Sequence, residues 1–374
     1  MALHQRTSAA ALLAACLAAA AAAAPVGDGA VNAYGQPLLT PSTFTMRGRQ
    51  VFYEIPAAPI LGVLAMMHGC AHDASDFWPR DASACPECDG LPEEVAHTKQ
   101  ALARGYAAIA VDASDATRCF GWHADGEDVA AILQHWIKQN NFTAKPLYLV
   151  GVSAGASLVL KLPRLLRVHG VISEVLGVQL DAWGMEELGA AFPPTAYVSM
   201  PRDARTAARI ADNQLLLRRY GVPTDVLLVQ PQPFTSDFLS NRSALFSPEL
   251  AAKVVAALRA TGLLDGAGVL LQDPRYTALP WRARVAAAVP ELAAGAGDSL
   301  VADASHVGEE LNRAYAMHEI VGDHLTACLA WLEARGTLPL AGLAQQFAAA
   351  RLPGPRLRDL SPRRLGMLPM RRRR

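Results

Sequence analysis

The stretch LYLVGVSAGASLVLKL, residues 147–162, decides the fold prediction for this chain. An apolar, β-branched run at 147–150 ends in Gly151-Val152-Ser153-Ala154-Gly155, and an apolar segment of helical length follows. A strand, a G-x-S-x-G turn and a helix in this order predict a nucleophile elbow. Glycine is expected two positions either side of the serine, because so sharp a turn leaves little room for side chains there.

The elbow makes Ser153 the candidate nucleophile. The turn lifts the Ser153 Oγ clear of the sheet and places the Ala154 N–H at a helix N-terminus, where it can face a developing oxyanion. The alternative interpretation is a turn of small residues that contains a serine by chance. The strand and the helix on either side favour the elbow.

Around the elbow, short apolar runs alternate with amphipathic segments. This alternation predicts an α/β fold with a mainly parallel sheet and helices on both faces. The helix at 91–104 is expected to expose Glu93, Glu94 and Lys99 and to end at Gly105. The expected strands span 43–55, 60–67, 106–111, 147–150, 168–178, 195–200 and 224–229, and the other main helices 126–139, 205–220 and 325–334.

The alternation stops after the last of these strands. Residues 234–317 show helical stretches at 247–261 and 281–294 together with glycine-rich turns, but no strand–helix cycle. We interpret 234–317 as a cap or lid inserted before the last helix, within one domain that spans 36–345. The remaining segment, 346–374, is basic and proline-rich, which is typical of a disordered tail.

The elbow, the preceding His68-Gly69 and the strand order together resemble the α/β-hydrolase superfamily, over roughly 43–229 plus the last helix. The resemblance implies an α/β-hydrolase fold, with nucleophile, acid and base in the chain order Ser, Asp or Glu, His. The loop Met67-His68-Gly69-Cys70-Ala71-His72-Asp73 is similar to the HGC loop of polyhydroxyalkanoate depolymerase-like and feruloyl esterase-like members. It implies that Cys70, or else Ala71, supplies the second amide of an oxyanion hole, with His68 orienting the loop.

Asp203 is the candidate acid, because it follows the strand at 195–200 at the sheet edge where catalytic groups of such folds gather. The alternative interpretation is that Asp203 caps the next helix; we prefer the catalytic role, and the two roles are compatible. For the base we prefer His318, since His318-Glu319 followed by Trp331-Leu332 resembles the end of related esterases. His324 is the main alternative and His306 the next.

The N-terminal 24 residues end in an alanine-rich apolar run, which predicts a secretory signal peptide too short for a membrane span; an organellar transit peptide is the alternative. Two glycosylation sequons, at Asn141 and Asn241, fit passage through a secretory lumen. Once Cys16 is removed with the signal, five cysteines remain. We expect Cys85, Cys88 and Cys119 to form disulfides, with the pairing open and a metal site at Cys85 and Cys88 as the weaker alternative.

The formal net charge is zero, so no nucleic-acid partner is expected. The resemblance implies a serine hydrolase that cleaves carboxylic esters through an acyl-enzyme, without cofactor or metal. The signal peptide predicts that it is secreted. Small-molecule and polymeric esters are both expected substrates. The alternatives are a serine peptidase of the prolyl-oligopeptidase type and a non-catalytic relative used for binding. The chain lacks the length for the propeller of such a peptidase, and its intact Ser153 and Asp203 favour an enzyme.

Overall fold

The computed structural model describes residues 39–57, 59–183, 185–294, 298 and 300–348. The predicted signal peptide at 1–24, Cys16 and nearly all of the basic tail at 346–374 lie outside the described residues. Within the described residues, no helix combines the length and the apolar character needed to cross a membrane.

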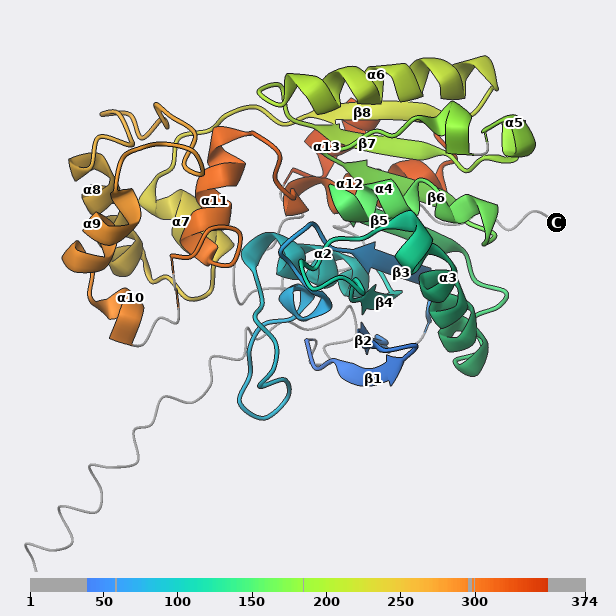
Figure 1. The fold of residues 1–374 in the computed structure, drawn as a ribbon, viewed down its shortest axis with the longest axis horizontal. Helices are drawn as coiled ribbons and strands as arrows, with labels where there is room; N and C mark the ends of the chain where they lie inside the picture. Colours follow the sequence, from blue (N-terminus) through green and yellow to red (C-terminus); the bar gives the residue numbers. More distant parts are fainter. Residues whose placement is uncertain (1–38, 58, 184, 295–297, 299, 349–374) are drawn as a thin grey trace, which may run out of the picture.

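In the part of the chain that the structure describes, an eight-stranded sheet in the order β1-β2-β4-β3-β5-β6-β7-β8 forms the centre (Figure 1). The first two strands pair antiparallel with each other, β2 pairs antiparallel with β4, and all other neighbours are parallel. This order confirms the predicted α/β-hydrolase fold. The strands are β1 (Ser42–Met46), β2 (Arg49–Glu54), β3 (Gly62–Met67), β4 (Tyr106–Val111), β5 (Leu147–Val152), β6 (Gly170–Glu174), β7 (Thr195–Ser199) and β8 (Thr224–Leu228).

The three central strands β3, β4 and β5 are buried at every residue, because helices cover both faces of the sheet. Side chains alternate between two hydrophobic clusters: Leu64 and Met66 pack on one face, Val63 and Ala65 on the other. The first face is covered by α2 (Pro92–Ala103), α12 (Leu325–Glu333) and α13 (Leu340–Gln346), and the second by α3 (Trp122–Gln139), α4 (Ala154–Val159) and α6 (Ala204–Arg219).

Three expectations about individual elements are wrong. The run at 43–55 is a hairpin of two strands rather than one strand, because Arg47 and Gly48 turn the chain with φ values of 53° and 74°. A further helix, α13, follows the helix that was expected to be the last. The predicted wet face of the helix at 91–104 is buried: Glu93, Glu94 and Lys99 are 0%, 1% and 7% exposed.

The described residues between 234 and 317, named the helical insertion below, have a hydrophobic cluster of their own, which includes Phe234, Leu258, Trp281 and Leu311. In Figure 1 it lies beside the sheet rather than over a face of it. The insertion ends at residue 317, so the next residue along the chain is His318, the preferred candidate base. Its helices are α7 (Ser236–Arg242), α8 (Pro248–Ala260), α9 (Trp281–Ala288), α10 (Glu291–Ala294) and α11 (His306–Tyr315).

Four cysteines form two disulfides, Cys70–Cys119 and Cys85–Cys88. The three cysteines expected in disulfides are therefore bonded, and Cys70 is the fourth member. Because Cys85 and Cys88 are bonded to each other, they offer no thiolates to a metal ion. Cys328 is free and buried. The first disulfide ties the HGC loop to the segment that precedes α3.

Candidate active site

The structure forms the predicted sharp turn at Ser153, between β5 and α4. Ser153 has φ 49° and ψ −111°, a strained conformation for a residue with a side chain. The two glycines are sterically required. A Cβ at Gly151 would lie 2.4 Å from the backbone of Gly155, and a Cβ at Gly155 would lie 2.2 Å from the carbonyl oxygen of Met67. The serine therefore stands at the carboxyl end of the central strand with its hydroxyl outside the helix.

Ser153, His318 and Asp203 form a continuous chain of hydrogen bonds. Ser153 Oγ lies 2.8 Å from His318 Nε2, and His318 Nδ1 lies 2.6 Å from Asp203 Oδ2. The other carboxylate oxygen, Oδ1, accepts the N–H of Thr206 at 3.2 Å and so caps α6. Partial burial opposes ionisation of Asp203, but hydrogen bonds from Thr206 and His318 prevail and lower its pKa below the ordinary value. Asp203 thus contacts His318 and caps α6 at the same time, so the two expected roles are compatible.

The two alternative bases lie elsewhere. His324 is the residue before α12, and its burial lowers its pKa. His306 begins α11 and lies 2.7 Å from the Oγ of Ser243 through Nδ1. Neither lines the cavity that contains Ser153. Of the three histidines considered, the structure brings only His318 to the serine.

The HGC loop lies against the elbow. Gly69 and Cys70 line the same cavity as Ser153. Ala71 donates its N–H to the carbonyl of Thr117 at 3.3 Å, so this amide is already used. The Cys70 N–H has no such bond to the described backbone, and the Ala154 N–H is a first-turn donor of α4 without an intrahelical acceptor. The geometry favours Cys70 over Ala71 as the second oxyanion donor.

His68 is hydrogen-bonded to the loop that carries Cys70. The ring is fully buried, with Nε2 accepting the N–H of Ala113 at 3.2 Å and Nδ1 lying 2.7 Å from the carbonyl of Gly69. Because Nε2 accepts, Nδ1 carries the proton and donates it to that carbonyl. Burial lowers the pKa of His68 to about 4, so the ring is neutral at neutral pH. This arrangement fits the expected orienting role.

Arg275 of the helical insertion holds the segment that carries His318. Its guanidinium donates to the carbonyls of Met317 (2.8 Å) and His318 (3.2 Å). It also pairs with the carboxylates of Asp303 (2.9 Å) and Glu319 (2.6 Å). His318 itself has a φ of 50°, so its backbone needs external support. Sequence reasoning missed Arg275, because no local motif marks a contact made across 43 residues.

The segment after His318 is fixed by buried carboxylates of the core. Glu174, at the end of β6, accepts the N–H of Val321 at 2.9 Å and lies 3.0 Å from His97 Nε2. Glu93 accepts the N–H of Gly322 at 2.7 Å. The bond to Gly322 explains one buried charge of α2: Glu93 binds a backbone N–H of the loop that follows His318.

A cavity of about 760 Å³ opens over Ser153 and His318. Its walls come from the elbow and the HGC loop, from α6 through Arg205 and Arg209, and from the insertion through Arg275 and Tyr276. The side chain of Tyr276 is largely exposed. The cavity is large enough to admit an acyl group together with its leaving group.

No protein-family model and no curated protein matches the sequence. Solved structures are similar over about half of the chain. Est1E from Butyrivibrio proteoclasticus is 10% identical with a TM-score of 0.36, and the match covers 52% of this chain and 89% of that one. An alpha-beta serine hydrolase homologue from Coxiella burnetii is 15% identical with a TM-score of 0.37, covering 51% and 87%. An esterase/lipase from an uncultured bacterium is 13% identical with a TM-score of 0.35, covering 51% and 74%.

Proposed function

We propose that this chain, which has the α/β-hydrolase fold, is a secreted serine hydrolase that cleaves carboxylic esters through an acyl-enzyme on Ser153. The observation that carries the proposal is the hydrogen-bonded series from Ser153 through His318 to Asp203 at the mouth of a large cavity. A nucleophile, a base in contact with it and a carboxylate that orients the base are the parts that acyl transfer requires.

In this mechanism His318 Nε2 takes the proton of Ser153 as Oγ attacks the acyl carbon. Asp203 holds the imidazole in one tautomer and stabilises the imidazolium that forms. The N–H groups of Cys70 and Ala154 stabilise the oxyanion, each worth about 10²–10³ in rate. His318 then passes the proton to the leaving alcohol, and water releases the acyl group by the same steps in reverse.

The proposed site of action is outside the cytoplasm. The two disulfides are compatible with an oxidising compartment. The asparagines of both sequons, Asn141 and Asn241, are exposed, as glycosylation requires. The cavity, of about 760 Å³, has room for a small ester or for the end of an ester polymer.

A fluorophosphonate probe tests the proposal directly. The wild-type protein is expected to become covalently labelled at Ser153, and Ser153→Ala, a change of one oxygen atom, is expected to remain unlabelled. Labelled protein is identified by peptide mass spectrometry. Hydrolysis of short p-nitrophenyl esters but not of peptide anilides would support an esterase. A folded wild-type sample that neither reacts with the probe nor hydrolyses the esters would refute the proposal.

Replacing Arg275 by lysine tests whether this residue positions His318. Lysine keeps the charge but cannot bond two carbonyls and two carboxylates in one plane. We expect kcat to fall about 10-fold to 100-fold with KM nearly unchanged, because a misplaced base weakens catalysis more than binding. Steady-state kinetics with a p-nitrophenyl ester measure both constants. A rise in KM alone would instead assign Arg275 to substrate binding.

A further inference from the structure

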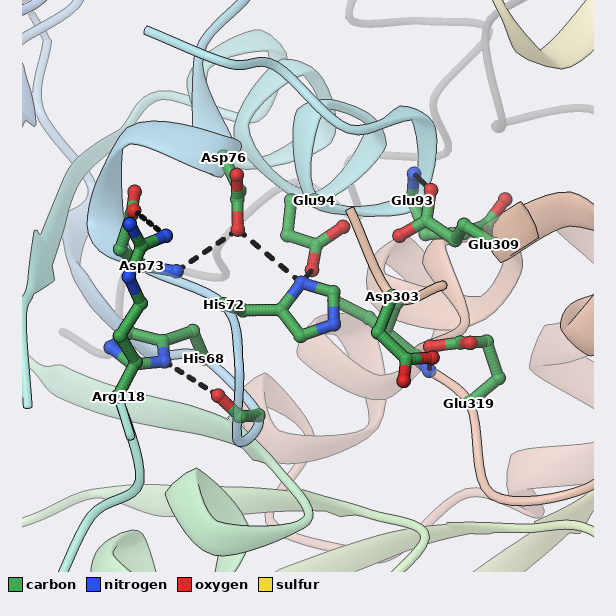
Figure 2. A network of polar contacts seen from close by, with 12 residues as sticks. His68, His72, Asp73, Asp76, Glu93, Glu94, Arg118, Asp303, Glu309 and Glu319 are labelled. Carbon is green, nitrogen blue, oxygen red and sulfur yellow. Dashed lines mark hydrogen bonds and ion pairs between the residues drawn. The ribbon is translucent and has the colours of Figure 1, made fainter. Parts of the chain in front are cut away.

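A second polar cluster lies next to the HGC loop, and none of its side chains takes part in the proposed hydrolysis (Figure 2). It consists of His72, Asp76 and Glu94. His72 lies in the loop after Cys70, Asp76 lies in η1 (Ala74–Phe77), and Glu94 lies in the first turn of α2. The three residues are 7%, 4% and 1% exposed. His72 Nδ1 lies 3.3 Å from Asp76 Oδ2 and 3.2 Å from Glu94 Oε1, and one donor atom from each residue falls within 4.8 Å of the others.

Several atoms of this cluster lack a hydrogen-bond partner. Glu94 Oε2 and Glu309 Oε1 are buried without one, and His72 Nδ1 meets the two carboxylates at ion-pair distance without the geometry of a hydrogen bond. Glu309 belongs to α11 of the insertion. Its other carboxylate oxygen, Oε2, accepts the N–H of Glu93 at 3.1 Å. The carboxyl groups of Glu94 and Glu309 are in direct contact, although both offer only acceptor oxygens when ionised. Two buried acceptors in contact require a proton or a cation between them.

Arginine does not neutralise this cluster. The neighbouring acids do have such partners: Arg242 pairs with Glu93, and Arg275 with Glu319. Within the described part of the chain, Asp76, Glu94 and Glu309 form no ion pair with lysine or arginine. One imidazole therefore faces the carboxyl groups of Asp76 and Glu94, and Glu309 adds a third carboxyl group beside Glu94. Burying charges without compensation is costly.

We propose that His72, Asp76 and Glu94 bind a divalent transition-metal ion of the Zn²⁺ type, with Glu309 at its edge. Tetrahedral Zn²⁺ at about 2.0–2.2 Å from its ligands sets neighbouring ligand atoms about 3.3–3.6 Å apart. The separations of 3.3 and 3.2 Å from His72 Nδ1 are close to that spacing. An imidazole nitrogen among carboxylates favours Zn²⁺ over Ca²⁺ or Mg²⁺, which take oxygen ligands.

The ion would have a structural task. It would join the loop at 70–77 to α2, and through Glu309 to α11 of the insertion. That loop carries the Cys70 amide, so the ion would fix the position of this proposed oxyanion donor. His72 and Glu94 also line the large cavity, which gives an ion a route to the site. This inference goes beyond the proposed hydrolysis and does not depend on it.

Metal content and thermal stability of the full-length protein test the site. The protein is purified through a tag without histidine, dialysed against a chelator, exposed to Zn²⁺ and freed of excess ion. We expect about one equivalent of Zn²⁺ by mass spectrometry, and a melting temperature that rises with Zn²⁺ and falls back with chelator. Glu94→Gln, which keeps the size of the side chain, is expected to lower the affinity for Zn²⁺ at least about 100-fold.

His135→Ala serves as the matched control. His135 is an exposed histidine of α3, so its removal shows how much Zn²⁺ binds to a surface histidine. It is expected to retain the wild-type stoichiometry. The proposal is overturned if the wild type binds well below one equivalent with an unchanged melting temperature, or if Glu94→Gln binds Zn²⁺ as the wild type does. If Glu94→Gln does not fold, the wild-type titration alone decides. None of these readouts uses activity, so failure of the hydrolase proposal and failure of the metal proposal remain distinguishable.

Discussion

Replacing His318 by alanine is expected to lower kcat/KM for a p-nitrophenyl ester by at least about 10⁴-fold. The imidazole lies 2.8 Å from the Ser153 hydroxyl, and neither His324 nor His306 lines the cavity that contains this pair. Without a base in contact, the hydroxyl keeps its proton and is a weak nucleophile at neutral pH. Fluorophosphonate labelling should slow in parallel, because it uses the same activated oxygen.

His324→Ala is the matched control for this loss. The wild-type ring is partly buried before α12, so alanine removes packing contacts and lowers the melting temperature. Activity per folded molecule, measured below the transition and corrected for the active fraction, should stay within about tenfold of the wild type. A fully active His318→Ala protein, or an inactive but folded His324→Ala protein, would contradict the assignment of the base.

The elbow could be read from the sequence because its requirements are local. Five consecutive residues, Gly151 to Gly155, contain both the serine and the glycines that its backbone needs, and the flanking strand and helix are contiguous. Asp203 could be predicted for a related reason: in a parallel sheet, the carboxyl ends of successive strands meet at one edge. The histidine was harder to place. Three candidates follow Asp203, and a resemblance rather than a physical rule favoured His318.

The errors arose where distant residues decide the outcome. Glu93 and Glu94 on an amphipathic helix were expected to face solvent, as charged residues usually do. They are buried because their partners come from far along the chain: the Gly322 N–H and Arg242 for Glu93, and His72 for Glu94. No pattern within α2 announces such partners. The missed hairpin had a local signal, since Gly48 interrupts the run at the point where the chain turns.

The contact between Arg275 and the backbone of His318 is another long-range interaction that the sequence did not reveal. The insertion was predicted from the loss of strand–helix alternation, and that loss says nothing about where its side chains point. In the structure, the insertion supplies Arg275 to the backbone of His318 and Glu309 to the neighbourhood of Glu94. The helical insertion thus contributes to both proposed sites through single side chains, which periodicity cannot locate.

Asp203→Asn is expected to lower kcat about 10⁴-fold while leaving the fold intact. The wild-type carboxylate accepts from His318 Nδ1 at 2.6 Å, and its lowered pKa keeps it ionised at neutral pH. Asparagine can instead present its amide N–H to Nδ1, which then accepts. The imidazole proton moves to Nε2, the nitrogen that must take the proton of Ser153, so the base is held in the wrong tautomer. Steady-state kinetics measure the loss.

Asp203→Ala separates this effect from the capping of α6. Asparagine can still accept the Thr206 N–H through its side-chain oxygen, whereas alanine cannot, so only alanine should lose about 0.5–2 kcal/mol of stability. Both variants should be inactive, and urea unfolding should distinguish them. An asparagine variant that retains activity within tenfold of the wild type would show that the carboxylate serves as a helix cap alone. A stable but inactive asparagine variant would place the loss in the hydrogen bond to His318, because the cap is then intact.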